Sequence, residues 1–168
     1  MKLNIKQKVF SFNEKFSILD ENGNEKYYVE GEIISLGKKL HLYSLQEEEI
    51  AYIHQKVLAL LPHYFISVEG KDEIEVEKKI SLTPKFVVDD LGWEVEGDFL
   101  AHEYDIKKGE DIIANVSKKW FSWGDSYEID VKNDADVIMA LSVILVIDAD
   151  LSNQDNLRRA RRIRNHSR

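Results

Sequence analysis

Short runs of alternating apolar and polar residues make up most of the first 130 residues of the chain. Ile74, Val76 and Ile80 are separated by charged residues, as in a strand with one buried and one solvated face. Asn22-Gly23 lies between two such runs, and this dipeptide favours the positive φ angles of a hairpin turn. Turn-forming residues recur about every ten positions, so the sequence predicts an all-β barrel or sandwich here.

The segment from Glu47 to Leu61 departs from this alternation. Its apolar residues, from Ile50 to Leu61, recur at the spacing of one helix face. Periodicity alone therefore predicts an amphipathic helix in this segment.

A second departure runs from Asp134 to Asp150. Val137 to Ile147 is apolar on every side, with Ser142 as its one polar member, and Asp134 is the expected N-cap. The run is shorter than the roughly 20 apolar residues that cross a bilayer, so we expect no transmembrane segment. A helix without a polar face must be surrounded, and strands are the elements available to surround it. We therefore expect a mainly β (α+β) fold, a closed or nearly closed β-barrel around a buried helix at about residues 134–150.

The composition is that of one folded domain. The chain has 168 residues, of which 43% are hydrophobic, and it has no cysteine. This removes thiol nucleophiles, thiolate metal sites and disulfides together. The first residues lack the apolar core of a signal peptide, which predicts a cytoplasmic location. We place the barrel domain at residues 1–151 and a basic C-terminal tail at 152–168.

Charge is distributed unevenly along the chain. The net charge is -8, and residues 151–168 hold six Arg and one Asp, a charge of +5. The first 150 residues therefore carry -8 - 5 = -13. This acidic body argues against nucleic-acid contact outside the tail. The tail arginines are expected to attract the phosphates of lipid or nucleic acid, the alternative being a solvated tail or one folded onto the acidic barrel. They are Arg158, Arg159, Arg161, Arg162 and Arg164.

Lysine occurs in four adjacent pairs, at 38–39, 78–79, 107–108 and 118–119. Exposed lysines commonly prevent strand edges from pairing with other chains. The alternative is that some of them, with Lys118 and Lys119 as the candidates, converge on one barrel face and bind phosphate. In the hairpin that contains this last pair, we expect Trp120 and Trp123 to brace the turn or cover the barrel end, with ligand contact as the alternative.

Known catalytic and metal-binding patterns fail along the chain. A calcium loop that starts at Asp20 would need Gly and Glu where Glu25 and Gly31 stand. The five histidines lack ligand spacing, and neither a GxSxG nucleophile motif nor a glycine-rich phosphate loop occurs. We therefore expect no catalytic residues, no metal site, no cofactor and no enzymatic activity.

Five aspartates bracket the apolar helix. A calcium loop that starts at Asp130 fails at its third and twelfth positions, so we expect these residues to cap the helix and to be solvated at its ends. They are Asp130, Asp134, Asp136, Asp148 and Asp150.

Several stretches together resemble one protein family. They are "ILDENGNEKYYVEGEIISLGKKLHL", "PHYFIS", "WEVEGDFLAHEYDI", "IIANVSKKWFSWGDSYEIDV" and "DADVIMALSVILVIDA". Over roughly residues 5 to 151 the chain resembles the LURP-one-related (YxjI-like) family, which belongs with the Tubby C-terminal and phospholipid scramblase superfamily. The resemblance implies a twelve-stranded barrel with a buried helix, and an extended conformation for Glu47–Leu61.

The resemblance does not by itself assign an enzymatic activity. Tubby domains bind phosphoinositides and scramblase relatives act at membranes, but Tubby's basic residues do not align with this chain, so none is transferred. Our hypothesis is a non-enzymatic binding module, cytoplasmic and peripheral at the membrane. It would meet anionic phospholipid or another phosphate-bearing ligand through the tail arginines with Lys118 and Lys119. The alternative is an intracellular scaffold that binds proteins through its barrel and has no lipid role.

Overall fold

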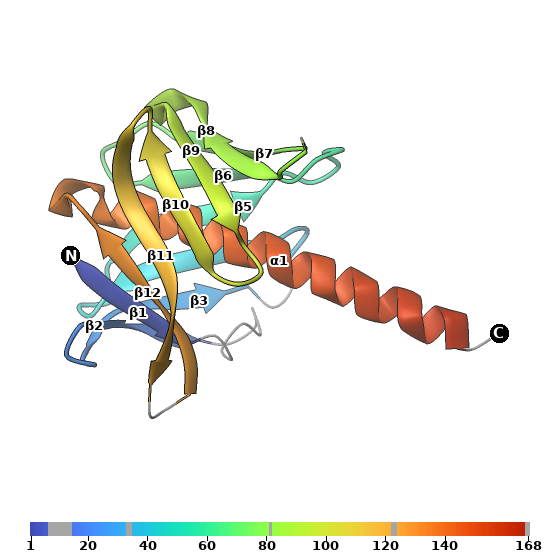
Figure 1. The fold of residues 1–168 in the computed structure, drawn as a ribbon, viewed down its shortest axis with the longest axis horizontal. Coiled ribbons are helices and arrows are strands. Elements are labelled where there is room, and N and C mark those ends of the chain that lie inside the picture. The colour runs from blue at the N-terminus through green and yellow to red at the C-terminus, as the bar shows by residue number, and fades with distance from the viewer. Residues whose placement is uncertain (7–14, 33–34, 81, 122–123, 167–168) are drawn as a thin grey trace.

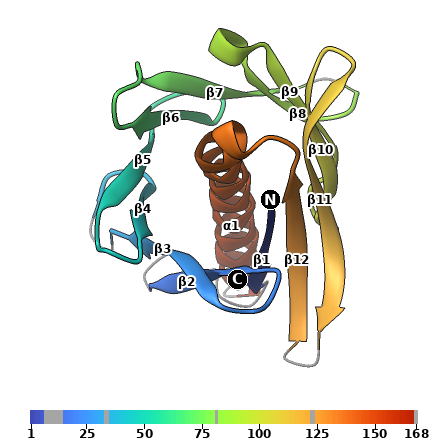
Figure 2. The ribbon, with the colours of Figure 1, turned by 90° about the vertical axis from the view of Figure 1, so that its left-hand side faces the viewer.

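The computed structural model describes residues 1–6, 15–32, 35–80, 82–121 and 124–166. Within these residues, twelve antiparallel strands form a closed barrel in which each strand pairs with the next and β12 pairs with β1 (Figures 1 and 2). The strands are β1 (Lys2–Lys6), β2 (Phe16–Asp20), β3 (Glu25–Gly31), β4 (Lys39–Ser44), β5 (Glu49–Gln55), β6 (His63–Val68), β7 (Ile74–Lys79), β8 (Lys85–Val88), β9 (Trp93–Asp98), β10 (Glu103–Lys108), β11 (Asp111–Phe121) and β12 (Gly124–Val131). The 3-10 turn η2 (Asp89–Leu91) lies between β8 and β9.

One long helix passes through the middle of this barrel. The 3-10 turn η3 (Asp134–Asp136) leads into α1 (Val137–His166), and the strands surround the first half of α1 in Figure 2. Leu141 and residues 143–147 have no exposed surface. The predicted mainly β fold with a buried helix is thus confirmed.

Two details of the helix differ from the sequence prediction. Asp134 lies inside the 3-10 turn η3, and the cap of that turn is Asn133, whose side chain accepts a hydrogen bond from the Ala135 N–H at 3.1 Å. The helix also continues through the basic segment to His166. Adding residues to an existing helix is favourable when they are good helix formers, and the segment is rich in arginine.

The helix predicted for Glu47–Leu61 is wrong, and the extended conformation implied by the family resemblance is confirmed. In β5, Ala51 and Ile53 are buried while the residues between them are partly exposed. Val57 and Leu58 lie in the following loop and are exposed. The helical spacing has no structural meaning, because it combines residues of a strand, such as the buried Ile53, with exposed residues of the loop that follows, such as Val57 and Leu58.

The Asn-Gly turn is confirmed as a hairpin between β2 and β3. Asp20 Oδ1 accepts hydrogen bonds from the peptide N–H groups of Asn22 and Asn24, both at 2.9 Å, and Gly23 has a φ of 83°.

In the β11–β12 hairpin, Trp123 and the side chain of Trp120 lie outside the described part of the chain, so their predicted packing stays a prediction.

The two ends of the barrel differ in what they carry. Antiparallel strands place alternate connections at opposite ends, and α1 leaves through the end that carries the β3–β4, β5–β6, β7–β8 and β9–β10 loops (Figure 1). We call this end the exit mouth. The opposite end carries the chain N-terminus, where the Met1 ammonium donates to the Val131 carbonyl at 2.6 Å.

Candidate functional site

Large apolar side chains are exposed around the exit mouth. Leu58, Leu60 and Leu82 have 100%, 104% and 107% relative exposure, which is complete. Leu58 also has a φ of 65°, a conformation that residues other than glycine rarely adopt. At the opposite end, the large apolar residues exposed in the described part of the chain are Leu45 and Ile112. We call the exposed set at the exit mouth the apolar rim; it consists of Leu36, Val57, Leu58, Leu60, Ile80, Leu82 and Leu100.

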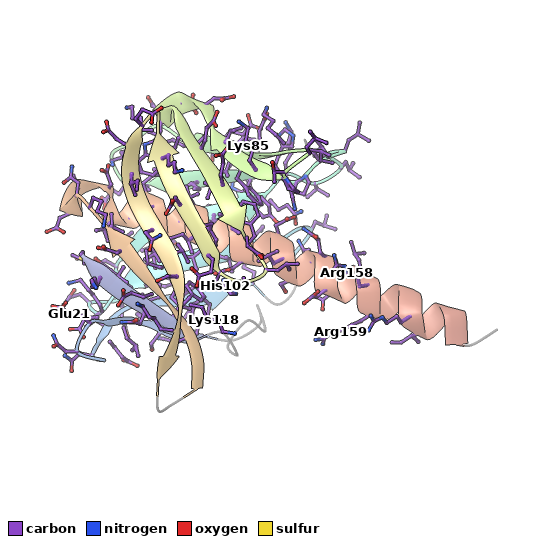
Figure 3. All side chains as sticks on the ribbon, in the orientation of Figure 1. Glu21, Lys85, His102, Lys118, Arg158 and Arg159 are labelled. Atoms are coloured by element: carbon purple, nitrogen blue, oxygen red, sulfur yellow. The ribbon has the colours of Figure 1, made fainter. Side chains whose placement is uncertain are left out.

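The predicted tail arginines lie on the part of α1 that projects from this mouth. Arg158, Arg159 and Arg162 are exposed, and Arg158 Nη1 lies 3.9 Å from Asp155 Oδ1. Figure 3 shows Arg158 and Arg159 on the projecting helix. The side chains of Arg161 and Arg164 lie outside the described part of the chain. Leu157 and Ile163 on the same projection are 60% and 70% exposed. The projecting helix is therefore basic, with separate apolar side chains.

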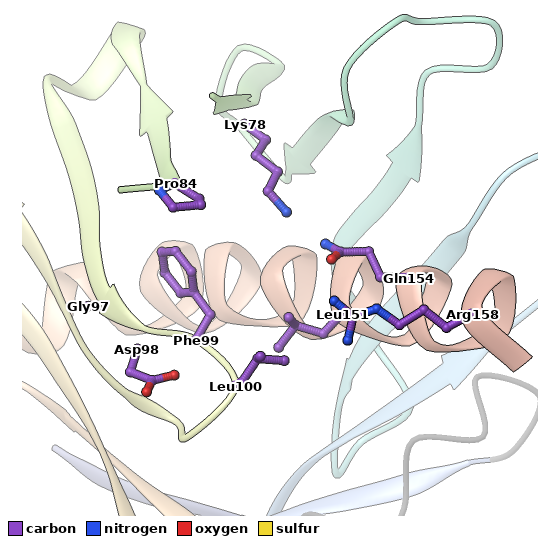
Figure 4. A pocket seen from close by; sticks show the side chains of 9 residues that line it. All are labelled: Lys78, Pro84, Gly97, Asp98, Phe99, Leu100, Leu151, Gln154 and Arg158. Carbon is purple, nitrogen blue, oxygen red and sulfur yellow. The ribbon is translucent and has the colours of Figure 1, made fainter. Parts of the chain in front are cut away.

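A pocket of about 510 Å³ lies between α1 and the ends of β7 and β9 (Figure 4). Phe99, Leu100 and Leu151 supply apolar walls, while Lys78 and Arg158 bring positive charge. Pockets of this volume accommodate a small organic ligand. The lining residues are Lys78, Pro84, Gly97, Asp98, Phe99, Leu100, Leu151, Gln154 and Arg158.

The inner side of the pocket is held by a buried ion pair. Lys78 Nζ donates to Asp150 Oδ2 at 2.5 Å, and Gln154 Nε2 donates to the same oxygen at 2.7 Å. The Asp150 side chain is 3% exposed. The expectation that Asp150 would be solvated at a helix end is wrong, because α1 continues past it.

Asp148 is buried as well, inside a polar cluster of the core. The Tyr127 hydroxyl donates to Asp148 Oδ2, and His102 Nδ1 lies 3.7 Å from Asp148 Oδ1. Burial raises the pKa of Asp148 to about 7, and burial together with the Lys118 charge lowers the pKa of His102 to about 4. Burial also raises the pKa of Tyr104, whose hydroxyl has no hydrogen-bond partner, well above its ordinary range. Sequence analysis missed this cluster because its members come from two strands, a turn and the helix, and only the fold brings them together.

Lys118 and Lys119 lie on the barrel wall and not on the projecting helix. Lys119 Nζ is 3.7 Å from Glu128 Oε1, and the Lys118 peptide N–H donates to Glu103 Oε1 at 2.9 Å. Figure 3 shows Lys118 apart from Arg158 and Arg159. Among the candidate basic residues whose side chains are described, the lysines and the arginines therefore do not form one continuous surface.

The interpretation of the lysine pairs as protection of strand edges is wrong. The closed barrel has no free edge, because β1 pairs with β12. Several of these lysines instead form ion pairs on the wall, such as Lys39 Nζ with Glu32 Oε2 at 3.0 Å. Lys78 is largely buried against Asp150.

One group of metal-ligand side chains stands out on the outer wall. His63, Glu75 and Glu77, on β6 and β7, place ligand atoms within 4.8 Å of one another. In the part of the chain that the structure describes, this is the one group of histidine and carboxylate side chains that meets this geometry. Sequence analysis missed this group because its three residues come together only when β6 pairs with β7.

α1 is too polar in its second half to serve as a membrane span. Among the residues with described structure, no helix combines the length and apolar character needed to cross a bilayer.

The architecture defines the class of protein, a closed antiparallel barrel threaded by its own C-terminal helix. The LURP-one-related family model matches residues 1–148. The chain is 40% identical over 157 residues to the uncharacterized protein YxjI of Bacillus subtilis, covering 93% of this chain and 97% of that relative. The chain belongs to the LURP-one-related family, which confirms the resemblance found in the sequence.

The fold is also similar to a solved structure. An X-ray structure of a protein from Arabidopsis thaliana superposes with a TM-score of 0.60 at 18% sequence identity, covering 90% of each chain. At this identity the likeness concerns the fold alone.

Proposed function

We propose that this protein is a non-enzymatic binding module whose exit mouth docks on an anionic phospholipid surface. One observation carries the proposal: the apolar rim and the basic half of α1 lie at the same end of the barrel. A membrane interface offers an apolar interior below a layer of phosphates. The exposed leucines of the apolar rim match the apolar interior, and the arginines of α1 match the phosphates.

The orientation follows from the cost of burying charge. An arginine at the centre of a bilayer costs several kcal/mol, so the projecting half of α1 is expected to lie along the surface instead of penetrating it. In that orientation Arg158 and Arg159 meet phosphates, and loops beside the helix reach the apolar boundary. Each arginine near an anionic surface contributes about 1 kcal/mol, and each leucine fully withdrawn from water contributes about 1.5–3 kcal/mol.

The pocket gives the surface a place for one lipid. Arg158 lines the same pocket as the apolar side chains of Phe99, Leu100 and Leu151, so charge and apolar wall occur within one cavity (Figure 4). A phosphate head group with hydrocarbon attached has the same two parts. Lys78 supports the site from inside, where Asp150 holds its ammonium group.

Vesicle co-sedimentation tests the electrostatic half of the proposal. The full chain should sediment with vesicles that contain phosphatidylserine and much less with pure phosphatidylcholine, and the difference should shrink as salt rises. The double variant Arg158→Gln/Arg159→Gln should weaken binding by about tenfold or more, since two contributions of about 1 kcal/mol are removed. Unchanged binding of the double variant would show that Arg158 and Arg159 do not contribute to vesicle binding.

The apolar half is tested by variants at the two barrel ends. Leu58→Ser/Leu60→Ser/Leu82→Ser changes fully exposed side chains and should leave the fold intact while vesicle binding falls. Leu45→Ser/Ile112→Ser changes exposed apolar residues at the opposite end and should bind as the original chain does. Equal behaviour of the two variants, or no sedimentation with any vesicle, would refute docking through the exit mouth.

A protein-binding scaffold is the second candidate, and a stack of rings on the outer wall favours it. The rings cross from β3 to β6 with neighbouring centroids between 4.9 and 6.2 Å apart, and all are partly exposed. Aromatic residues are enriched at protein interfaces. The rings belong to Tyr28, Tyr43, His41, Tyr52, His54 and Phe65. A photo-crosslinking residue at Tyr52 should then capture a defined protein that the same residue at Leu45 does not.

A further inference from the structure

Three side chains on the outer face of β6 and β7 converge on one point. His63 lies directly opposite Glu77 in the strand pairing, and Glu75 precedes Glu77 by two residues on the same face of β7. His63 Nδ1 is 2.8 Å from Glu75 Oε1 and 3.5 Å from Glu77 Oε1. One imidazole nitrogen therefore faces two carboxylate oxygens.

A proton cannot satisfy this arrangement fully. Nδ1 carries at most one hydrogen, so it cannot donate a full hydrogen bond to both carboxylates. Lys79 forms its ion pair through Glu77 Oε2, so Glu77 Oε1 stays directed at His63. A cation placed between the three ligand atoms would contact all of them.

We propose that His63, Glu75 and Glu77 form a binding site for a divalent transition-metal ion, with Zn²⁺ as the best fit. Zn²⁺ takes histidine nitrogen and carboxylate oxygen at about 2.0–2.2 Å, so its ligand atoms lie about 3.4 Å apart in a tetrahedron. The separation of 3.5 Å matches this value, and the separation of 2.8 Å would lengthen by about 0.6 Å when an ion binds. Ca²⁺ and Mg²⁺ prefer oxygen ligands alone, so the imidazole selects against them.

The position of the site suggests what an ion would do. His63 begins β6 directly after the loop with Leu58 and Leu60, and β7 ends at Lys79, just before the loop with Leu82. An ion held between the two strands would tie together the bases of two loops of the apolar rim. The metal site is inferred independently of the lipid-binding proposal.

His41 provides a matched control within the same barrel. It also faces two glutamates, but through different ring nitrogens: Nδ1 lies 2.6 Å from Glu49 Oε2, and Nε2 lies 3.2 Å from Glu32 Oε1. Ligands on opposite sides of an imidazole ring cannot share one ion with it. His41 therefore has the same composition as the proposed site without its geometry.

Zn²⁺ titration of the full chain in competition with a chromophoric chelator tests the site. The chelator-stripped protein should take up one Zn²⁺, His63→Gln should weaken binding by at least about tenfold, and His41→Gln should bind like the original chain. Lys79→Gln removes a competing cation and should tighten binding. Absence of binding by the original chain, or equal affinities of the His63→Gln and His41→Gln variants, would overturn the proposal; circular dichroism verifies that each variant is folded.

Discussion

His102 stacks on Tyr127 inside the barrel, with ring centroids 4.5 Å apart and planes within 4° of parallel. Both rings face Asp148: Tyr127 donates a hydrogen bond to one carboxyl oxygen, and the His102 Nδ1 atom lies near the other. An aspartic acid and a histidine are thus buried together without forming a hydrogen bond to each other. Their protonation differs between the folded and unfolded states, which makes stability depend on pH.

Asp148 and His102 should impose opposite pH slopes on stability. Asp148 has a pKa of about 7 against an ordinary 3.8, so its contribution to the free energy of unfolding falls as pH rises from about 4 to about 7. His102 has a pKa of about 4 against 6.5, so its contribution is lost as pH falls from about 6.5 to 4. Between pH 4 and 6.5 the two slopes largely cancel.

Substitution separates the two slopes. Asp148→Asn keeps an acceptor for Tyr127 and removes the titration, so its stability relative to the original chain should rise by about 4 kcal/mol between pH 4 and 7.5. Urea unfolding at several pH values measures this difference. A variant that stays parallel to the original chain across that range would show that Asp148 titrates normally.

The Lys78–Asp150 ion pair predicts a large difference between single and double substitution. Lys78→Met leaves the Asp150 carboxylate buried with Gln154 as its remaining hydrogen-bond donor, which should cost about 3–5 kcal/mol. Lys78→Met/Asp150→Asn removes both charges and should recover most of that loss. Urea unfolding measures the stability of both variants. A double variant that is less stable than Lys78→Met would contradict the prediction.

Gly97 is required by the close pairing of β9 with β10. It has a φ of 143°, and a Cβ atom there would lie 2.5 Å from the Glu103 carbonyl oxygen and 2.6 Å from Tyr104 Cα. Gly97→Ala should therefore destabilise the protein by about 3 kcal/mol or more, since the obstacle is backbone. Gly109 has a φ of 59° and open space around it, so Gly109→Ala should cost about 1–2 kcal/mol for backbone strain alone. Similar melting temperatures of the two variants would refute the steric argument.

Leu145 tests the contribution of the buried half of α1. Its side chain has no exposed surface, so Leu145→Ala should lower the free energy of unfolding by about 2–5 kcal/mol. Leu157 lies on the same helix but is 60% exposed, and Leu157→Ala should change stability by less than about 0.5 kcal/mol. Leu145→Asp should leave no soluble folded protein, and a soluble, cooperatively melting Leu145→Asp variant would contradict the burial of this segment.

The barrel with its enclosed helix could be predicted from the sequence because it follows from the local pattern of apolar and polar residues. Alternation along strands such as β7 requires a sheet with one buried face, and the all-round apolar run from Val137 to Ile147 requires an enclosure. The Asn22-Gly23 turn likewise depends on backbone preferences of two adjacent residues. The basic segment was evident from composition, although its helical conformation was not.

Tertiary structure decided the rest, because barrel closure joins residues that are distant in the chain. Lys78 and Asp150 are 72 positions apart, and strand pairing alone brings His63 to Glu77. The sequence predicted that α1 ends near Asp150, with Asp148 and Asp150 exposed to solvent. Because α1 continues beyond the barrel, both residues are buried in the middle of the helix. The apolar rim exists because alternate loops meet at the same end of an antiparallel barrel, and no local pattern specifies which loops those are.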